Sequence, residues 1–176
     1  MNVAFAPVLV GALVPLVMGL SPAGGASAPL GRCHTRDLRV YLGRSGAAAG
    51  SLETEVVFRN RSSHSCFVYG YPGFGLENAR RQVMPSHVTW GSTFAQRDPG
   101  RHRIILTPGR AAFANLAWSD VPVAGEDQRT CGGLSAWLQV TPPDEQRFRL
   151  VPFKAMVCSY GHLTATALSR IRGPRG

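Results

Sequence analysis

The sequence predicts an all-β protein, an antiparallel β-sandwich of about eight to nine short strands. Apolar residues occupy alternate positions in several short runs, and no stretch shows the spacing of an amphipathic helix. The 20 glycines and 13 prolines supply turn signals between these runs, about every 8–12 residues. This combination is typical of sandwiches whose strands are joined by tight turns.

In the first half of the chain, the predicted strands lie on both sides of a Gly-Tyr-Pro-Gly turn at 70–73. They span residues 38–42, 52–58, 66–69 and 74–76. The clearest is 52–58, where Leu52, Thr54, Val56 and Phe58 alternate with a polar set that includes two glutamates. Between the first two strands, the Gly-, Ala- and Ser-rich residues 43–50 predict a loop.

In the second half, strands are expected over residues 88–90, 103–106, 110–118, 136–140, 148–150 and 163–168. In 110–118, the small residues Ala112 and Ala114 share a face with Leu116 and Trp118, which indicates close approach of a facing sheet. Residues 82–100 carry little strand signal, and residues 119–133 predict a long loop.

The ends of the chain predict three regions. Residues 1–28 are interpreted as a signal peptide, because an apolar run over 8–20 precedes Ala26-Ser27-Ala28, an A-x-A cleavage pattern. No Lys or Arg stands before that run, and an uncleaved anchor is the alternative. Residues 29–169 form the sandwich domain, and the arginine-rich residues 170–176 predict a disordered basic tail.

The four cysteines are Cys33, Cys66, Cys131 and Cys158, an even and widely spaced set. Behind an export signal, such a set predicts two disulfides in an oxidising compartment. Three pairings exist, and we favour Cys33–Cys66 with Cys131–Cys158, because each bond then ties neighbouring strands within one half of the chain. An antibody-like Cys66…Trp90…Cys131 arrangement lacks its supporting tyrosine, since position 129 is arginine.

The net charge of +9 suggests an anionic partner. However, 18 of the 19 cationic residues are arginine and Lys154 is the only lysine, a bias that a GC-rich genome also produces. The expected partner is an anionic cell-wall polymer or another envelope protein, with no nucleic acid and no membrane span after signal cleavage. The candidate surface-binding residues are Tyr71, Arg80, Arg81, Arg170, Arg172 and Arg175. Tyr69, Phe74 and Trp90 could extend this set into an aromatic platform, although Phe67, Tyr69 and Phe74 are expected mostly in the core.

These landmarks together resemble a secreted actinobacterial family known as domain of unknown function 4232. The matching residues are Cys33 with Leu38, 46–50, Asn60 with Ser62, Cys66, 70–73, Leu106 with Pro108-Gly109, 112–118, Cys131, Val140 with Pro142-Pro143, and Cys158. The resemblance implies an exported or lipid-anchored domain of immunoglobulin-like type with no established activity. Arg32 stands before Cys33, where a lipid-anchoring signal has a small residue, and this departure argues against a lipid anchor.

The chain shows no motif for catalysis or cofactor binding, and no enzyme, cofactor or metal is expected. Gly-x-Ser-x-Gly is absent, and the five histidines stand in polar, loop-like settings. His64 with Cys66, and Cys158 with His162, each offer only two metal ligands. We therefore expect a secreted or envelope-associated, non-catalytic binding or structural module. The alternatives are a small envelope enzyme and a host-facing protein-binding module.

Overall fold

The computed structural model describes residues 1–2 and 29–173, in which nearly all regular structure is β. A short 3-10 helix, η1 (Thr35–Asp37), precedes the first strand. The strands are β1 (Leu38–Ala48), β2 (Ser51–Asn60), β3 (Cys66–Tyr69), β4 (Gly73–Glu77), β5 (Val83–Met84), β6 (His87–Trp90), β7 (Arg103–Leu106), β8 (Ala111–Ser119), β9 (Leu134–Thr141), β10 (Arg149–Met156) and β11 (His162–Ala165). The all-β prediction is confirmed, with eleven strands instead of eight to nine. Apart from residues 1 and 2, the expected signal peptide lies outside the described residues.

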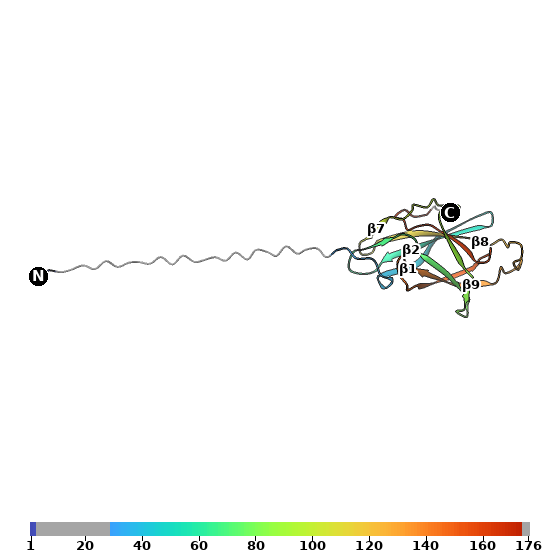
Figure 1. Cartoon of the computed structure of the whole chain (residues 1–176), viewed down its shortest axis with the longest axis horizontal. Helices are drawn as coiled ribbons and strands as arrows, with labels where there is room; N and C mark the ends of the chain where they lie inside the picture. The colour runs from blue at the N-terminus through green and yellow to red at the C-terminus, as the bar shows by residue number, and fades with distance from the viewer. Residues whose placement is uncertain (3–28, 174–176) are drawn as a thin grey trace.

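The strands form two main sheets and one small sheet (Figure 1). The first main sheet has the order β1-β2-β8-β11-β6 and the second has the order β10-β9-β4-β5, while β3 pairs with β7. All neighbouring strands are antiparallel except β6 and β11, which run parallel. In the described residues, no helix is both long and apolar enough to cross a membrane.

The core lies between the two main sheets, as in a sandwich. Val56 and Leu116 of the first sheet and Leu138 of the second are buried in one apolar cluster. At its margin the ring of Trp118 meets the ring of Phe153 edge-on, with centroids 4.9 Å apart. Burial of this apolar surface is the main force that holds the sheets together.

The predicted loop at residues 43–50 is wrong, because β1 continues to Ala48 and pairs with β2 along most of its length. Only Ala49 and Gly50 form the turn, with φ values of +46° and +81°, as a two-residue hairpin requires. The register shifts between Leu42 and Ser45, where β1 bulges. Small residues resemble a loop in sequence, but backbone pairing with β2 needs no large side chains.

Two glutamates on β2 are buried, although the alternating pattern is typical of a strand with one solvated face. Glu53 is 5% exposed and Glu55 is 2% exposed. Because β2 lies between β1 and β8, its outer face is flanked on both sides, and Glu53 stands beside Gly46 and Ala117. Because these neighbouring residues are small, later segments of the chain can lie over the carboxylates and shield them from water.

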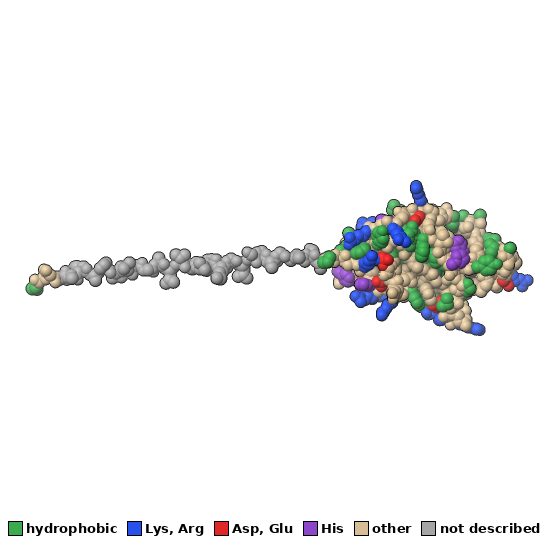
Figure 2. All heavy atoms as spheres, viewed as in Figure 1, with side chains coloured by type: hydrophobic (Ala, Val, Ile, Leu, Met, Phe, Trp, Pro, Cys, Tyr) green, Lys and Arg blue, Asp and Glu red, His purple; other side chains and the backbone are tan. Residues whose placement is uncertain are grey.

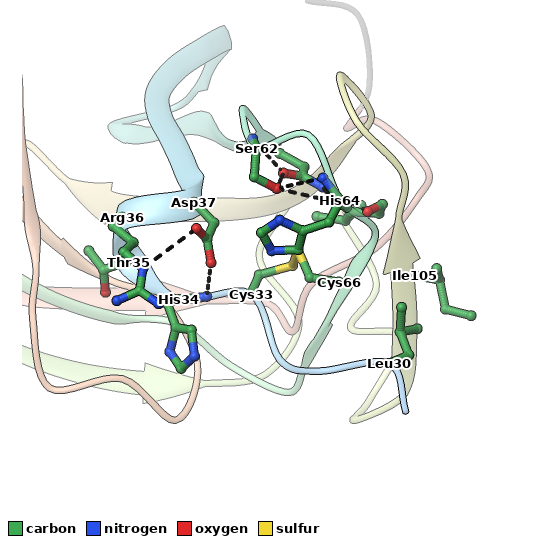
Figure 3. The surroundings of a disulfide bond; sticks show 12 residues. Leu30, Cys33, His34, Thr35, Arg36, Asp37, Ser62, His64, Cys66 and Ile105 are labelled. Atoms are coloured by element: carbon green, nitrogen blue, oxygen red, sulfur yellow. Dashed lines mark hydrogen bonds and ion pairs between the residues drawn. A yellow bond between two sulfur atoms is a disulfide. The ribbon is translucent and has the colours of Figure 1, made fainter. Parts of the chain in front are cut away.

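The two disulfides are Cys33–Cys66 and Cys131–Cys158, the pairing favoured from the sequence. Figure 3 shows the first, which joins the segment before η1 to the start of β3. The backbone reinforces this link, since Cys33 N–H donates to the Phe67 carbonyl (2.8 Å) and Phe67 N–H donates to the Gly31 carbonyl (3.0 Å). Two disulfides are consistent with an extracellular location.

The described part of the basic tail, residues 170–173, contacts the domain instead of standing in solvent. Arg170 donates a hydrogen bond from Nη2 to the Ile105 carbonyl (3.1 Å). Arg172 forms an ion pair with Glu55, in which Nη2 lies 3.0 Å from Oε2. The buried Glu55 carboxylate on β2 thus binds a segment for which composition alone predicted disorder. Arg175 lies outside the described residues.

Candidate functional site

The small β3–β7 sheet presents large side chains to solvent. Residues alternate between the core and the surface along each strand, so Val68 and Ile104 are buried. The outward side chains are Phe67, Tyr69, Arg103 and Ile105. Tyr69 is 39% exposed, which differs from the expectation that it lies in the core.

Two arginines lie over aromatic rings on this side of the domain. The Arg103 guanidinium carbon is 3.9 Å from the centroid of Phe67, and that of Arg101 is 5.7 Å from the centroid of Tyr71. Such stacking orients a guanidinium while leaving its edge free to donate hydrogen bonds. Among the described residues, neither arginine has a carboxylate partner.

Tyr71 is held in place by a carboxylate. Its hydroxyl donates a 2.5 Å hydrogen bond to Asp98, whose other oxygen accepts the Ala167 N–H at 2.7 Å. This hydrogen bond, with burial and the negative charge of Asp98, raises the pKa of Tyr71 above its usual value of 10.0. The hydroxyl therefore keeps its proton to a higher pH, and Asp98 links the ring to the segment that follows β11.

Trp90, at the end of β6, completes a shallow hollow beside Tyr71. Its ring centroid is 6.1 Å from that of Tyr71, and its indole N–H donates to the Pro72 carbonyl at 3.1 Å. Trp90 is 54% exposed, so its ring forms a wall of the hollow. The cavity has a volume of about 170 Å³, and Tyr69, Arg101 and the Pro143-Asp144 pair also line it.

A second hollow lies at the other end of β7. It has a volume of about 490 Å³ and is lined by Ile105, Arg110, Phe113 and Arg170, among others. We call the surface from Trp90 to Arg170 the aromatic–arginine face. It is defined by Phe67, Tyr69, Tyr71, Trp90, Arg101, Arg103, Ile105 and Arg170. In Figure 2, arginine side chains gather beside apolar ones at the end of the domain where residue 29 enters.

The structure brings together only some of the residues singled out in the sequence. Tyr71 and Arg170 lie on the aromatic–arginine face, and Arg172 pairs with Glu55. Arg80 and Arg81, expected beside the platform, instead belong to the turn between β4 and β5. There Arg81 pairs with Glu77 and lies over the ring of Trp137, at 5.5 Å.

Arg101 and Arg103 are the site residues that sequence reasoning missed. Arg101 directly follows Pro99-Gly100, a pair that signals only a turn. Arg103 and Ile105 are exposed and Ile104 and Leu106 are buried, but the Arg-Ile-Ile-Leu sequence does not alternate in polarity and carried no signal for this arrangement. Their proximity to Phe67 and Tyr71 depends on the pairing of β3 with β7, which local sequence does not reveal.

Among the described residues, one group of side chains has the proximity that a metal site requires. Glu126 lies close to the sulfurs of Cys131 and Cys158. Both sulfurs are bonded to each other, so neither can act as a thiolate ligand. The Glu126 carboxylate accepts backbone N–H groups from Val123, Ser159 and Tyr160, which lower its pKa. This carboxylate therefore organises a loop.

Three of the histidines interact with neighbouring side chains. His34 Nδ1 lies 3.0 Å from Glu145, whose second oxygen accepts the Thr35 hydroxyl proton at 2.8 Å. His87 and His162 stack with centroids 4.6 Å apart, where parallel strands β6 and β11 begin. Burial, aided by the neighbouring His87, lowers the pKa of His162 below 6.5.

The sequence profile of one family, the Domain of unknown function (DUF4232), matches residues 33–169. The chain belongs to this family. The match begins at the first disulfide cysteine and ends after β11, so the DUF4232 domain includes all eleven strands and both disulfides. The comparisons with curated proteins and with solved structures found no match.

Proposed function

We propose that this DUF4232 domain is an exported, non-catalytic binding module whose aromatic–arginine face engages an anionic polysaccharide of the cell envelope. One observation carries the proposal. Arg101 and Arg103 lie over aromatic rings at the surface, and neither forms an ion pair with a carboxylate of the described residues.

The chemistry of these groups matches an acidic sugar polymer. A guanidinium donates two parallel hydrogen bonds to a carboxylate or phosphate. The exposed rings of Tyr69 and Trp90 offer apolar surface on which the C–H face of a sugar ring is removed from water. Charge and ring surface lie within one hollow, so a charged sugar unit can use both.

The shape supports a polymer as the ligand. The smaller hollow beside Trp90 and the larger one beside Arg170 lie at opposite ends of β7. An extended chain can occupy both hollows and contact Arg103 between them. The Cys33–Cys66 disulfide holds β3 under this surface, which limits the entropy lost when the ligand binds.

Binding to an immobilised polyuronate tests the proposal, with neutral dextran and poly-glutamate as comparison polymers. The double variant Arg101→Ala/Arg103→Ala should bind the polyuronate roughly tenfold or more weakly, because two charge-assisted contacts are lost. Trp90→Ala should weaken binding to the polyuronate and leave the weaker binding to poly-glutamate unchanged. Binding by the unmodified protein should fall steeply between 50 and 300 mM salt.

Arg80→Ala/Arg129→Ala is the matched control, since it removes the same charge from exposed turns outside the face. Equal losses in the two double variants would show that net charge alone drives retention and would refute a specific site. No retention of the unmodified protein at low salt would refute the proposal outright.

A further inference from the structure

A third cavity lies on the outer face of the five-stranded sheet. It has a volume of about 200 Å³ and includes Glu53, Glu55, Asn115, Phe94 and Gly173 in its lining. Glu53 and Glu55 alternate along β2 with the core residues Thr54 and Val56, so both carboxylates point to this outer face. The cavity therefore holds two acidic side chains, with Arg44 also in its lining and Arg172 paired with Glu55.

One of these carboxylates has an oxygen that lacks a hydrogen-bond partner among the described residues. Glu53 is 5% exposed, and its buried Oε2 accepts no hydrogen bond from the part of the chain that the structure describes. A buried carboxylate oxygen without a donor destabilises the folded protein. This oxygen is closed to solvent, but Glu53 lines the cavity, so a donor placed there can reach the oxygen when the carboxylate rotates.

The neighbouring carboxylate shows which donor suits this face. Arg172 bonds Glu55 through two atoms, with Nε 3.3 Å from Oε1 and Nη2 3.0 Å from Oε2. The same guanidinium lies 5.0 Å from the ring centroid of Phe113. Glu53 offers a second carboxylate on the same strand, and the 47%-exposed Phe94 ring lies at its cavity.

Small residues create the space. Gly46 pairs with Glu53 across the β1–β2 ladder and lines the cavity, and a Cβ built there meets nothing within 4 Å. A Cβ at Gly43 would overlap the Glu55 carboxylate. The bulge in β1 thus sets glycines against both acids and leaves room for a group the size of one amino-acid side chain.

We propose that the Glu53 cavity binds a small organic cation that carries N–H donors, an alkylammonium or alkylguanidinium group. The cation donates to the unpartnered Glu53 oxygen, and its alkyl part packs against Phe94. Asn115, which is buried beside Glu55, supplies an amide oxygen or N–H for a second hydrogen bond. This cavity shares no lining residue with either hollow of the aromatic–arginine face.

Calorimetric titration with methylguanidinium and butylammonium tests the site, with tetramethylammonium as a cation of similar charge but without N–H. The first two should bind saturably, whereas tetramethylammonium should bind at least tenfold more weakly. Glu53→Gln keeps the shape and removes the charge, and it should weaken binding roughly 10- to 100-fold. Asp144→Asn, which removes the same charge in the hollow beside Trp90, should leave the affinity unchanged.

A second variant keeps the carboxylate and fills the space. Gly46→Leu should abolish binding while Glu53 remains, because its side chain enters the cavity. Without ligand, Glu53→Gln should unfold at the same temperature as the unmodified protein or a higher one, since an unpartnered carboxylate is removed. That result would separate loss of binding from loss of folding.

Three outcomes would overturn the proposal. One is equal affinity of Glu53→Gln and the unmodified protein for methylguanidinium. Another is equal binding of tetramethylammonium, which would indicate nonspecific charge attraction. The third is binding only by a chain that ends at Gly173, because residues 174–176 would then be the occupant.

Discussion

At the scale of single residues, partners determine the role of a side chain more than its type. Trp90 and Tyr69 are exposed and line a hollow, whereas Trp118 packs against the core. Glu53 and Glu55 share one strand, yet only Glu55 has an arginine partner among the described residues. Tyr71 differs from Tyr69 because its hydroxyl meets Asp98.

Tyr71→Phe should lower the free energy of unfolding by about 1–2 kcal/mol, because a half-buried hydrogen bond to a carboxylate is lost. The raised pKa of Tyr71 has a second consequence. In absorbance titrations above pH 10, the last tyrosine to ionise in the unmodified protein should be missing from the variant. Tyr69→Phe removes a hydroxyl with no hydrogen-bond partner among the described residues and is the matched control. Equal stability losses in the two variants would show that the Asp98 contact contributes nothing.

At the scale of elements, the segment before η1 behaves as an additional strand beside β3. Arg32 bridges Phe67 in parallel orientation, and the Cys33–Cys66 bond fixes the register. Arg32 also lies over Phe67, on the side of the sheet that carries the aromatic–arginine face. The disulfide consequently supports both the fold and the candidate site.

Cys33→Ser/Cys66→Ser should lower the free energy of unfolding by about 3–4 kcal/mol, as expected for a bond that closes a loop of about 33 residues. Urea unfolding measures this change. Hydrogen exchange at the Cys33-equivalent and Phe67 amides should accelerate, because both belong to the segment that the bond secures. Cys131→Ser/Cys158→Ser should destabilise by a similar amount while those two amides stay protected. Rapid exchange in both variants would contradict a local role for the first disulfide.

At the scale of the whole molecule, the stacked histidines make stability depend on pH. The pKa of His162 is lowered in the folded protein by burial and by His87, so the unfolded chain binds this proton more tightly. Stability is therefore full above about pH 6.5 and decreases as the pH falls through that value towards the folded pKa. Protonation of His162 also places a positive ring against the stacked ring of His87.

His162→Gln should reduce the loss in thermal midpoint between pH 7.5 and pH 5.5, because the neutral side chain does not titrate. Thermal unfolding followed by circular dichroism at both pH values measures the effect. His64→Gln changes an exposed loop histidine and should retain the acid sensitivity of the unmodified protein. An unchanged pH dependence in His162→Gln would assign the sensitivity to other groups.

Much of the architecture follows from the sequence because it depends on local chemistry. Alternation of apolar residues identified most strands, and the spacing of the cysteines favoured the pairing that the structure contains. The two-residue strand β5 lies where the pattern is weak, and the glycine-rich half of β1 has a loop composition. These two segments are strands because each forms backbone hydrogen bonds with a neighbouring strand, β4 for β5 and β2 for β1.

Alone, the sequence predicted an all-β sandwich, favoured one of three disulfide pairings and indicated Tyr71 as a residue worth testing. Only the tertiary structure decided which arginines join Tyr71. It replaced Arg80 and Arg81 with Arg101 and Arg103, because the β3–β7 pairing brings distant segments together. It also buried Glu53 and Glu55, because β2 lies inside its sheet and the segment after β11 covers its outer face. Alternation tells which residues share a face, and only the packing of other segments decides whether that face meets water.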